Sequence, residues 1–391
     1  MVKMKGILLA WGAIFCFFVP SSRGIAGNIH VGSLGIHPYV SVSAGYTDNV
    51  FLTQTAETSD TFYLISPGIK LILPIKRQTF NLDYTVDHYI YRERDEADRT
   101  VHNATGTLDL NPWESLNIQI SDKFTRSEDA PDFEGDRTSP FIWNSSGVDA
   151  EYDISSRLAL GGGYEYRIKR YDRSIDRIDD YNEDGLSGRL YIRILPKTSL
   201  MMLYQYQARD YEERGIENNH SNRLEGGVTW KIGANSMGTV RVGYMQTDYH
   251  RIDQTDDTLS YFISLTHQFG PKTTLSLEGV REILDSTRAD DNLAFSNSYV
   301  STQIAATLSH CYRKLTGRLR VGYIGDTYLH DDIGAGTKRR DSLLRTEFGI
   351  DYALQRWLNL GGSYRYSRLN SNFRTEEYEE SIFLVHLSLV L

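Results

Sequence analysis

One segment of the chain has the residue types and spacing of a metal site. Asp180, Asn182 and Asp184 offer oxygen donors at alternate positions, and Gly185 follows where a calcium-binding loop makes its sharp turn. The twelfth position of such a loop should be a bidentate glutamate, but here it is Tyr191. The segment is therefore an incomplete calcium motif, and the alternative is a solvated acidic loop.

Residues suited to catalysis form no familiar arrangement. The ten histidines, from His30 to His386, lack the paired spacing of a zinc site, and no G-x-S-x-G elbow is present. Gly161, Gly162 and Gly163 lie inside an alternating stretch, where glycine relieves crowding or allows curvature. We therefore expect neither enzymatic activity nor a cofactor.

The composition of the chain is typical of strands. Of 391 residues only 9 are proline, whereas 26 are tyrosine and 32 are glycine. Charged residues make up 24% and aromatic residues 12%, which argues against a disordered chain. The formal net charge is −9, and we expect no nucleic acid as a partner.

The beginning of the chain predicts export. Residues 1–5 carry two lysines, residues 6–20 are almost all apolar, and Gly24 and Ala26 suit a cleavage site after Ala26. We expect a signal peptide over 1–26, a short periplasmic segment over 27–36 and the main domain over 37–391. No later stretch is apolar enough for a membrane helix, which leaves a soluble secreted β protein or a membrane barrel.

Short turns and long polar segments alternate through this domain, with a period of about 40 residues. The stretches between them, about ten residues each, alternate in polarity as strands do. Counting them gives eighteen strands, nine long loops, among them 247–256, and eight short turns. A sandwich would not sort its loops by length, and a propeller needs repeat signatures that are absent. We therefore predict an all-β, transmembrane antiparallel up-and-down β-barrel with short periplasmic turns and long extracellular loops.

Aromatic residues on the apolar face support a membrane barrel. They recur just before the long loops and, less often, just before the short turns, where the two interfacial girdles should lie. The first set is Tyr46, Tyr164, Tyr166, Tyr204, Tyr206, Tyr244, Tyr323, Tyr364 and Tyr366, and the second is Tyr152, Trp230, Phe269 and Tyr352. The chain ends on an alternating apolar strand that resembles the recognition signal of the barrel-assembly machinery.

The face assigned to the lumen carries charges that segregate by sign. The inward positions of the seventh to eleventh strands carry eight cations and only two acids, Glu165 and Glu225. Those of the third to sixth strands carry five acids and only one cation, Lys123. Either these walls set up a field across the channel, or their charges pair and fill it. The predicted pore-lining residues are Arg167, Lys169, Arg189, Arg193, Arg209, Arg223, Lys231, Arg241, Asp83, Asp87, Asp109, Asp149 and Glu151.

The face assignment makes a direct prediction about two neighbouring residues. Val242→Arg, on the lipid face, should cost about 2 to 4 kcal/mol near the midplane, whereas Arg241→Ser, on the lumen face, should cost little.

Three segments near the N-terminus carry a resemblance to a known family. They are HPYVSVSAGYTDNVFLT (37–53), TFYLISPGIKLILP (61–74) and FNLDYTVDHYIY (80–91). They resemble the start of the putative β-barrel porin-2 family, which comprises outer-membrane barrels often associated with exopolysaccharide synthesis and export. The resemblance implies an eighteen-stranded porin-like barrel in the bacterial outer membrane that serves a polysaccharide secretion system.

We thus expect a pore for polysaccharide export, with outer-membrane lipid, polysaccharide and periplasmic export components as partners. The alternatives are a passive diffusion porin for small solutes and a structural or adhesive barrel without an open pore. Eighteen strands leave room for an aqueous channel, whereas the interior of an eight-stranded barrel is filled by side chains.

Overall fold

The computed structural model describes residues 29–127, 140–213, 217–232, 235–286, 298–331 and 336–390. The predicted signal peptide lies outside the described residues. Three short 3-10 helices, η1 (Asp95–Ala97), η2 (Ser174–Asp179) and η4 (Arg374–Glu376), lie between strands in the described ranges, where no helix is long and apolar enough to cross a membrane. The strands of these ranges are β1 (Ile29–Val31), β2 (Leu34–Thr47), β3 (Asp60–Ile75), β4 (Gln78–Tyr91), β5 (Arg99–Trp113), β6 (Leu116–Ser127), β7 (Phe141–Asp153), β8 (Leu158–Tyr171), β9 (Tyr181–Leu195), β10 (Thr198–Tyr211), β11 (Asn219–Ile232), β12 (Ser236–Tyr249), β13 (Gln254–Phe269), β14 (Thr273–Asp285), β15 (Ser298–Tyr312), β16 (Leu315–Asp331), β17 (Lys338–Gln355), β18 (Leu358–Ser371) and β19 (Tyr378–Val390).

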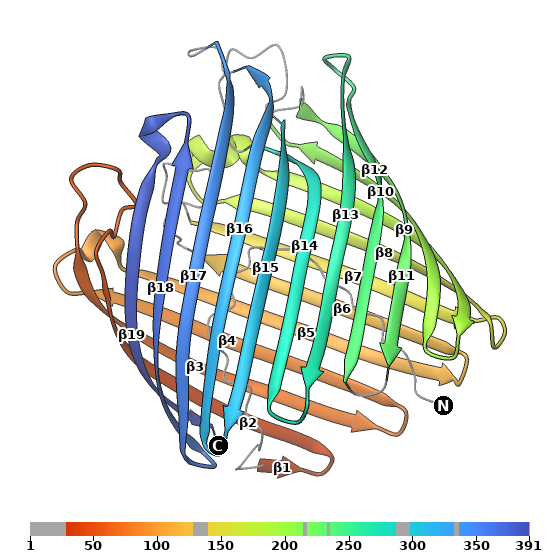
Figure 1. Ribbon diagram of the computed structural model, residues 1–391, viewed down its shortest axis with the longest axis horizontal. Coiled ribbons are helices and arrows are strands. Elements are labelled where there is room, and N and C mark those ends of the chain that lie inside the picture. Colours follow the sequence, from red (N-terminus) through yellow and green to blue (C-terminus); the bar gives the residue numbers. More distant parts are fainter. Residues whose placement is uncertain are drawn as a thin grey trace.

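Eighteen of these strands, β2 to β19, form one closed antiparallel barrel (Figure 1). Each strand pairs with its neighbours in sequence, and β19 pairs with β2 from Ile382↔Thr47 to Val390↔Tyr39. Closure leaves no free sheet edge, so backbone groups in the membrane can pair with neighbouring strands without water. The predicted fold class and strand number are confirmed.

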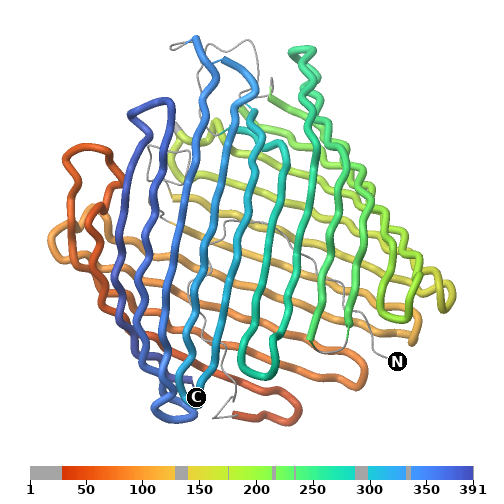
Figure 2. The backbone as a smooth tube through the Cα atoms, viewed as in Figure 1, coloured from red at the N-terminus to blue at the C-terminus, as the bar shows by residue number. Residues whose placement is uncertain are grey.

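The short turns lie together at one end of the barrel, and the longer connections, such as residues 48–59, lie at the other, as the smooth trace shows (Figure 2). At the end with the short turns, β1 forms a small hairpin with β2. Strand β2 begins at Leu34, three residues before the predicted start of the barrel domain.

The strands are longer than the predicted ten residues and measure 12 to 18 in the barrel. The difference is clearest at residues 247–256, predicted as a long loop. Strand β12 continues to Tyr249 and β13 begins at Gln254, so only residues 250–253 connect them. Outside the bilayer both faces of a ladder meet water. Polar residues there continue the strand without the alternation that the prediction relied on.

The outward face is apolar and exposed. Val242 at the middle of β12 is 53% exposed, and tyrosines of both predicted girdles, such as Tyr164 and Tyr352, lie exposed on this face. Hydroxyl groups of the tyrosine girdle near the long loops donate hydrogen bonds to the neighbouring strand. Tyr164 Oη donates to Asp184 Oδ1 at 2.6 Å, and Tyr204 Oη donates to Asn222 Oδ1 at 2.7 Å. Exposed apolar rows of this kind suit contact with lipid.

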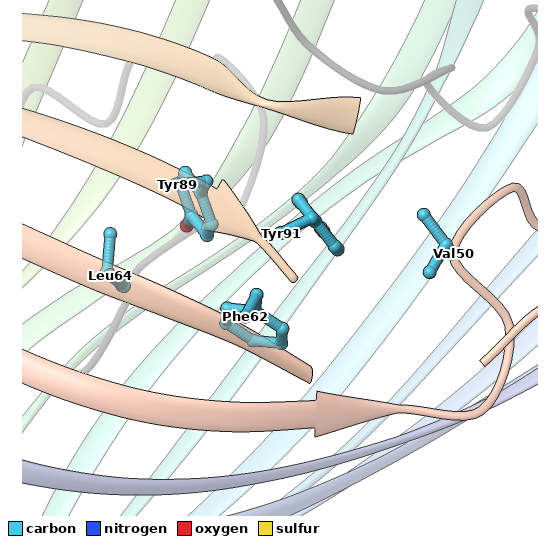
Figure 3. Packing of buried hydrophobic residues seen from close by; sticks show 5 residues of the cluster. All are labelled: Val50, Phe62, Leu64, Tyr89 and Tyr91. Carbon is cyan, nitrogen blue, oxygen red and sulfur yellow. The ribbon is translucent and has the colours of Figure 1, made fainter. Parts of the chain in front are cut away.

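Part of the buried apolar surface lies inside the barrel, where the loop after β2 folds back. Val50 on that loop packs with Phe62 and Leu64 of β3 and Tyr89 and Tyr91 of β4 (Figure 3). This loop therefore narrows the mouth of the barrel on the long-loop side.

One fully buried amide anchors this loop. Asn49 Nδ2 donates to the carbonyl oxygens of Thr53 and Glu379, both at 2.8 Å, and its Oδ1 accepts from the Thr53 N–H at 3.0 Å. The side chain thus ties the loop to itself and to the beginning of β19, where Glu379 is the second residue.

Candidate channel lining

The predicted pore-lining residues lie on the inner face of the barrel. Each has an odd number, and on their strands the even-numbered positions carry the exposed apolar side chains, such as Leu160, Met202 and Val242. The structure places Asp83 and Asp87 on β4, Asp109 on β5, Asp149 and Glu151 on β7, Arg167 and Lys169 on β8, Arg189 and Arg193 on β9, Arg209 on β10, Arg223 and Lys231 on β11, and Arg241 on β12.

Two arginines of β9 pair with acids two strands away. Arg189 Nη2 bonds to Asp149 of β7, and Arg193 Nη2 bonds to Asp153 of the same strand. Strand β8 runs between the partners, so the side chains of each pair meet over its inner face. Residues 40 apart in sequence are thereby joined in the lumen.

Glycines on the middle strand make room for the first pair. A Cβ at Gly161 would lie 2.8 Å from Arg189 Nε, and a Cβ at Gly163 would lie 2.8 Å from Asp149 Oδ2. The intervening Gly162 has only a backbone oxygen within reach, at 3.7 Å. The two odd-numbered glycines therefore relieve crowding under an ion pair.

A second cluster of charges lies on β8, β9 and β10. Glu183, whose side chain is 5% exposed, accepts from Arg167 Nη1 and from Arg209 Nη2, each at 2.6 Å. Glu165 accepts from Arg167 Nη2 at 2.7 Å. These short charge-assisted bonds lock both guanidinium groups. Sequence reasoning missed Glu183 as a lining residue because it assigned that residue to a loop.

Further charges of the inner wall are also paired. Arg241 Nε donates to Glu225 Oε2 at 2.8 Å, and Arg223 Nη2 to Glu282 Oε2 at 2.6 Å. The Lys169 ammonium lies 4.9 Å from the centre of the Phe141 ring. At least six of the eight cations predicted for the positive wall thus have a carboxylate partner. Pairing, the alternative that the sequence left open, is favoured by these contacts over an uncompensated field.

The acidic wall bonds mainly to neutral groups. Asp83 Oδ1 accepts from Tyr39 Oη at 2.7 Å, and Asp109 Oδ1 accepts from Gln119 Nε2 at 2.8 Å. Lys70 of β3 is the residue directly opposite Asp83 in the ladder, so this part of the acidic wall also has a cation beside it.

The segment with calcium-like spacing is mostly strand and not a loop. Asn182 and Asp184 lie on β9, face outward and accept hydrogen bonds from Tyr166 Oη at 3.0 Å and Tyr164 Oη at 2.6 Å. Asp180 Oδ1 accepts from the Tyr171 N–H at 2.7 Å, and burial raises the pKa of the Asp180 carboxyl. An extended strand cannot wrap these oxygens around one ion. Among the described residues, no group of three or more His, Cys, Asp or Glu side chains could hold a metal.

Comparisons with known proteins identify a family for the chain and solved structures to which it is similar. A family model described as "Putative beta-barrel porin 2" matches residues 25–390. No curated protein matches the chain. Among solved structures, the outer membrane protein OpdK from Pseudomonas aeruginosa is 12% identical, with a TM-score of 0.46, over 91% of this chain and 99% of that one. A BenF-like porin from Pseudomonas fluorescens Pf-5 is also 12% identical, with a TM-score of 0.48 and the same coverage.

Proposed function

The chain belongs to the putative beta-barrel porin 2 family, and on that premise we propose that this outer-membrane barrel is a channel for hydrophilic molecules that serves exopolysaccharide secretion. The observation that carries the proposal is the closed ring of β2 to β19, whose outer face is apolar and whose inner face is polar and charged. A ring of this size encloses an aqueous lumen.

The ion-paired wall supports a polymer of sugars as the cargo. Arginine–carboxylate pairs such as Arg189–Asp149 offer many hydrogen-bonding groups but little net charge. Sugar hydroxyls can exchange bonds along such a wall without being trapped by one strong site, and transport requires binding that is weak and repeated. Contact with periplasmic export components and insertion by the barrel-assembly machinery are part of the same proposal.

A passive diffusion porin for small solutes is the second candidate, and the loop after β2 favours it. Val50 and Asn49 hold that loop inside the mouth, which narrows the path available to a chain of sugars. A structural or adhesive barrel is the third possibility and requires a lumen that passes no ions.

Planar bilayers separate the three candidates. The refolded protein should give discrete conductance steps, and neutral dextran fragments of increasing length, added on one side, should interrupt the current and then emerge on the other side. Conductance without passage of the longer fragments would leave the diffusion porin as the function. Absence of any conductance step would exclude both channels in favour of the structural barrel.

A deletion in cells provides the complementary test. Loss of the gene should lower the amount of secreted polysaccharide, and restoring the wild-type chain should recover it. Unchanged secretion, together with slower uptake of small hydrophilic solutes, would contradict the export proposal.

A further inference from the structure

The loop-side end of β14 leaves the barrel wall. The ladder between β13 and β14 stops at Tyr261↔Arg281, although β13 continues to Gln254 alongside β12. Strand β14 itself continues beside β15 as far as Asp285↔Ser298. Residues 282–285, which we call the inner end of β14, are therefore paired with β15 but not with β13.

The contacts of Asp285 show where this inner end lies. Asp285 Oδ2 is 3.0 Å from Asn219 Nδ2 on β11 and 2.9 Å from Arg209 Nη1 on β10. In a regular barrel β11 would be three strand spacings from β14, or about 14 Å, and β10 about 19 Å. Asp285 can reach both partners only if the inner end of β14 crosses the inner faces of β13 and β12.

The carboxylate of Asp285 fixes this crossing with four donors. Besides Arg209 and Asn219, it accepts from Tyr249 Oη at 2.6 Å and from Tyr211 Oη at 3.2 Å. Its side chain is 7% exposed. Four converging donors, one of them a guanidinium, make this carboxylate a strong anchor.

Two further contacts hold the rest of the inner end. Glu282 Oε2 accepts from Arg223 Nη2 at 2.6 Å. Ile283 is buried with Met245 of β12 and Val300 of β15. The inner end is thus held by charge at both ends and by apolar packing between them.

The ion pairs that connect to the inner end have a small negative excess. Three guanidinium groups, those of Arg167, Arg209 and Arg223, pair with four carboxylates, and the group has a formal charge of −1. The carboxylates are Glu165, Glu183, Glu282 and Asp285.

We propose that the inner end of β14 is the constriction that selects solutes by size and charge, with Asp285 as the residue that positions it. The inference rests on the proposed channel function. It assigns uncharged and cationic hydrophilic molecules as the class that passes this point most easily, because the local charge is negative and the crossing backbone reduces the open section.

A disulfide tests the position of the inner end independently of transport. Asn219→Cys with Asp285→Cys, in a Cys311→Ser background, should form an intramolecular disulfide on mild oxidation of the folded protein. Cys311 is the free cysteine of the described residues, so the background removes competing thiols. The matched control is Asn219→Cys with Glu278→Cys, since Glu278 lies within the β13 ladder and cannot approach β11. Equal oxidation of the two pairs would overturn the crossing.

Conductance tests the role of the constriction. Asp285→Ala should raise the single-channel conductance and shift the polymer exclusion limit to larger polyethylene glycols, because the anchor is lost. It should also shift the zero-current potential in a salt gradient toward anions. Asp331→Ala, which removes an exposed acid at the end of β16, should change none of these quantities. Heat-modifiable migration on gels establishes that each variant has folded.

The outcomes separate the two proposals. If the Asn219→Cys, Asp285→Cys variant forms its disulfide but the wild-type protein conducts no ions, the channel function is refuted and, with it, the constriction. A conducting wild type whose Asp285→Ala variant keeps the same conductance and exclusion limit would overturn the constriction while leaving the channel function intact.

Discussion

Arg241 is the residue at which the structure most changes the expectation from sequence. Alternation places it in the lumen, where Arg241→Ser should be tolerated. In the structure Arg241 Nε donates to Glu225 Oε2 at 2.8 Å, and the Glu225 side chain is fully buried while that of Arg241 is 16% exposed. The guanidinium also lies 4.1 Å from the centre of the Phe262 ring. We now expect Arg241→Ser to be costly.

The magnitude follows from burial. Removing one partner of a buried ion pair costs about 3 to 5 kcal/mol, because the remaining charge has neither water nor a partner. Partial exposure of Arg241 places the expected loss in unfolding free energy near the low end, at about 3 kcal/mol. Val242→Arg should cost about 2 to 4 kcal/mol for a different reason, because it moves a charge into lipid at the middle of β12.

Urea titrations of the protein in lipid vesicles measure both losses. Because both single variants are destabilised, the diagnostic measurement is the double variant Arg241→Ser with Glu225→Gln. Neutralising Glu225 removes the buried charge, so the double variant should recover a large part of the loss, with a coupling energy of up to about 3 kcal/mol. Glu225→Gln combined with Val242→Arg should recover nothing.

Two results would refute this reasoning. If Arg241→Ser unfolds within about 0.5 kcal/mol of the wild type, water reaches Glu225 and the pair is not buried. If the double variant shows no coupling, the loss arises from the cavity left by the arginine stem and not from the charge of Glu225.

Three further predictions concern the wall and the closure of the barrel. The double variant Arg189→Ser, Arg193→Ser should shift the zero-current potential toward cation preference, because Asp149 and Asp153 lose their partners. An unchanged potential would show that these residues do not line the conducting path. Gly163→Val should lower the unfolding free energy by about 1 to 3 kcal/mol in urea titrations, because the new side chain displaces Asp149. Gly162→Val, on the lipid side, should not lower it. Equal stabilities of the two variants would show that Gly163 is not needed to make room for Asp149. The unboiled protein should migrate differently from the boiled protein in detergent gels, since a closed barrel has no free edge; identical migration would contradict closure.

Much of the fold could be predicted from local pattern. Alternation fixes which face of β12 meets lipid, and the regular recurrence of turns gives the strand number because adjacent strands pair through short connections. Strand ends could not be predicted in the same way. At residues 247–256 the ladder extends above the membrane, where polarity no longer alternates and only backbone hydrogen bonds define the strand.

The ion pairs carried a signal in the sequence that inspection of single strands misses. A repeat of about 40 residues returns the chain to the same height two strands further on. Asp149 and Arg189, like Asp153 and Arg193, are separated by 40 residues and meet across β8. When the charges are counted strand by strand, the two signs appear segregated. When each charged residue is compared with the residue about 40 positions later, acids and arginines that can pair are already apparent.

The inner end of β14 had no comparable signal. Odd-numbered residues of β14 such as Leu277 face outward, so alternation would also place Ile283 and Asp285 outward. Both instead lie inside, because the strand end leaves β13 and changes direction. This change of direction depends on the Asp285 carboxylate, which accepts hydrogen bonds from four donors on three other strands. Contacts between residues so far apart in the sequence cannot be predicted from a local pattern.

Glycines beneath paired polar side chains recur on the other side of the barrel and point to a common physical role. Asp351 of β17 and His386 of β19 meet at 2.9 Å across β18, where a Cβ at Gly361 would lie 2.5 Å from Asp351 Oδ1. A pair that spans two strand boundaries constrains the register of both ladders at once. A slip of two residues would keep every apolar side chain facing lipid, so the hydrophobic pattern alone cannot prevent it. The same slip would separate Asp351 from His386 and Asp149 from Arg189. Side-chain pairs that reach over a middle strand therefore fix the register that the alternation of polarity leaves open.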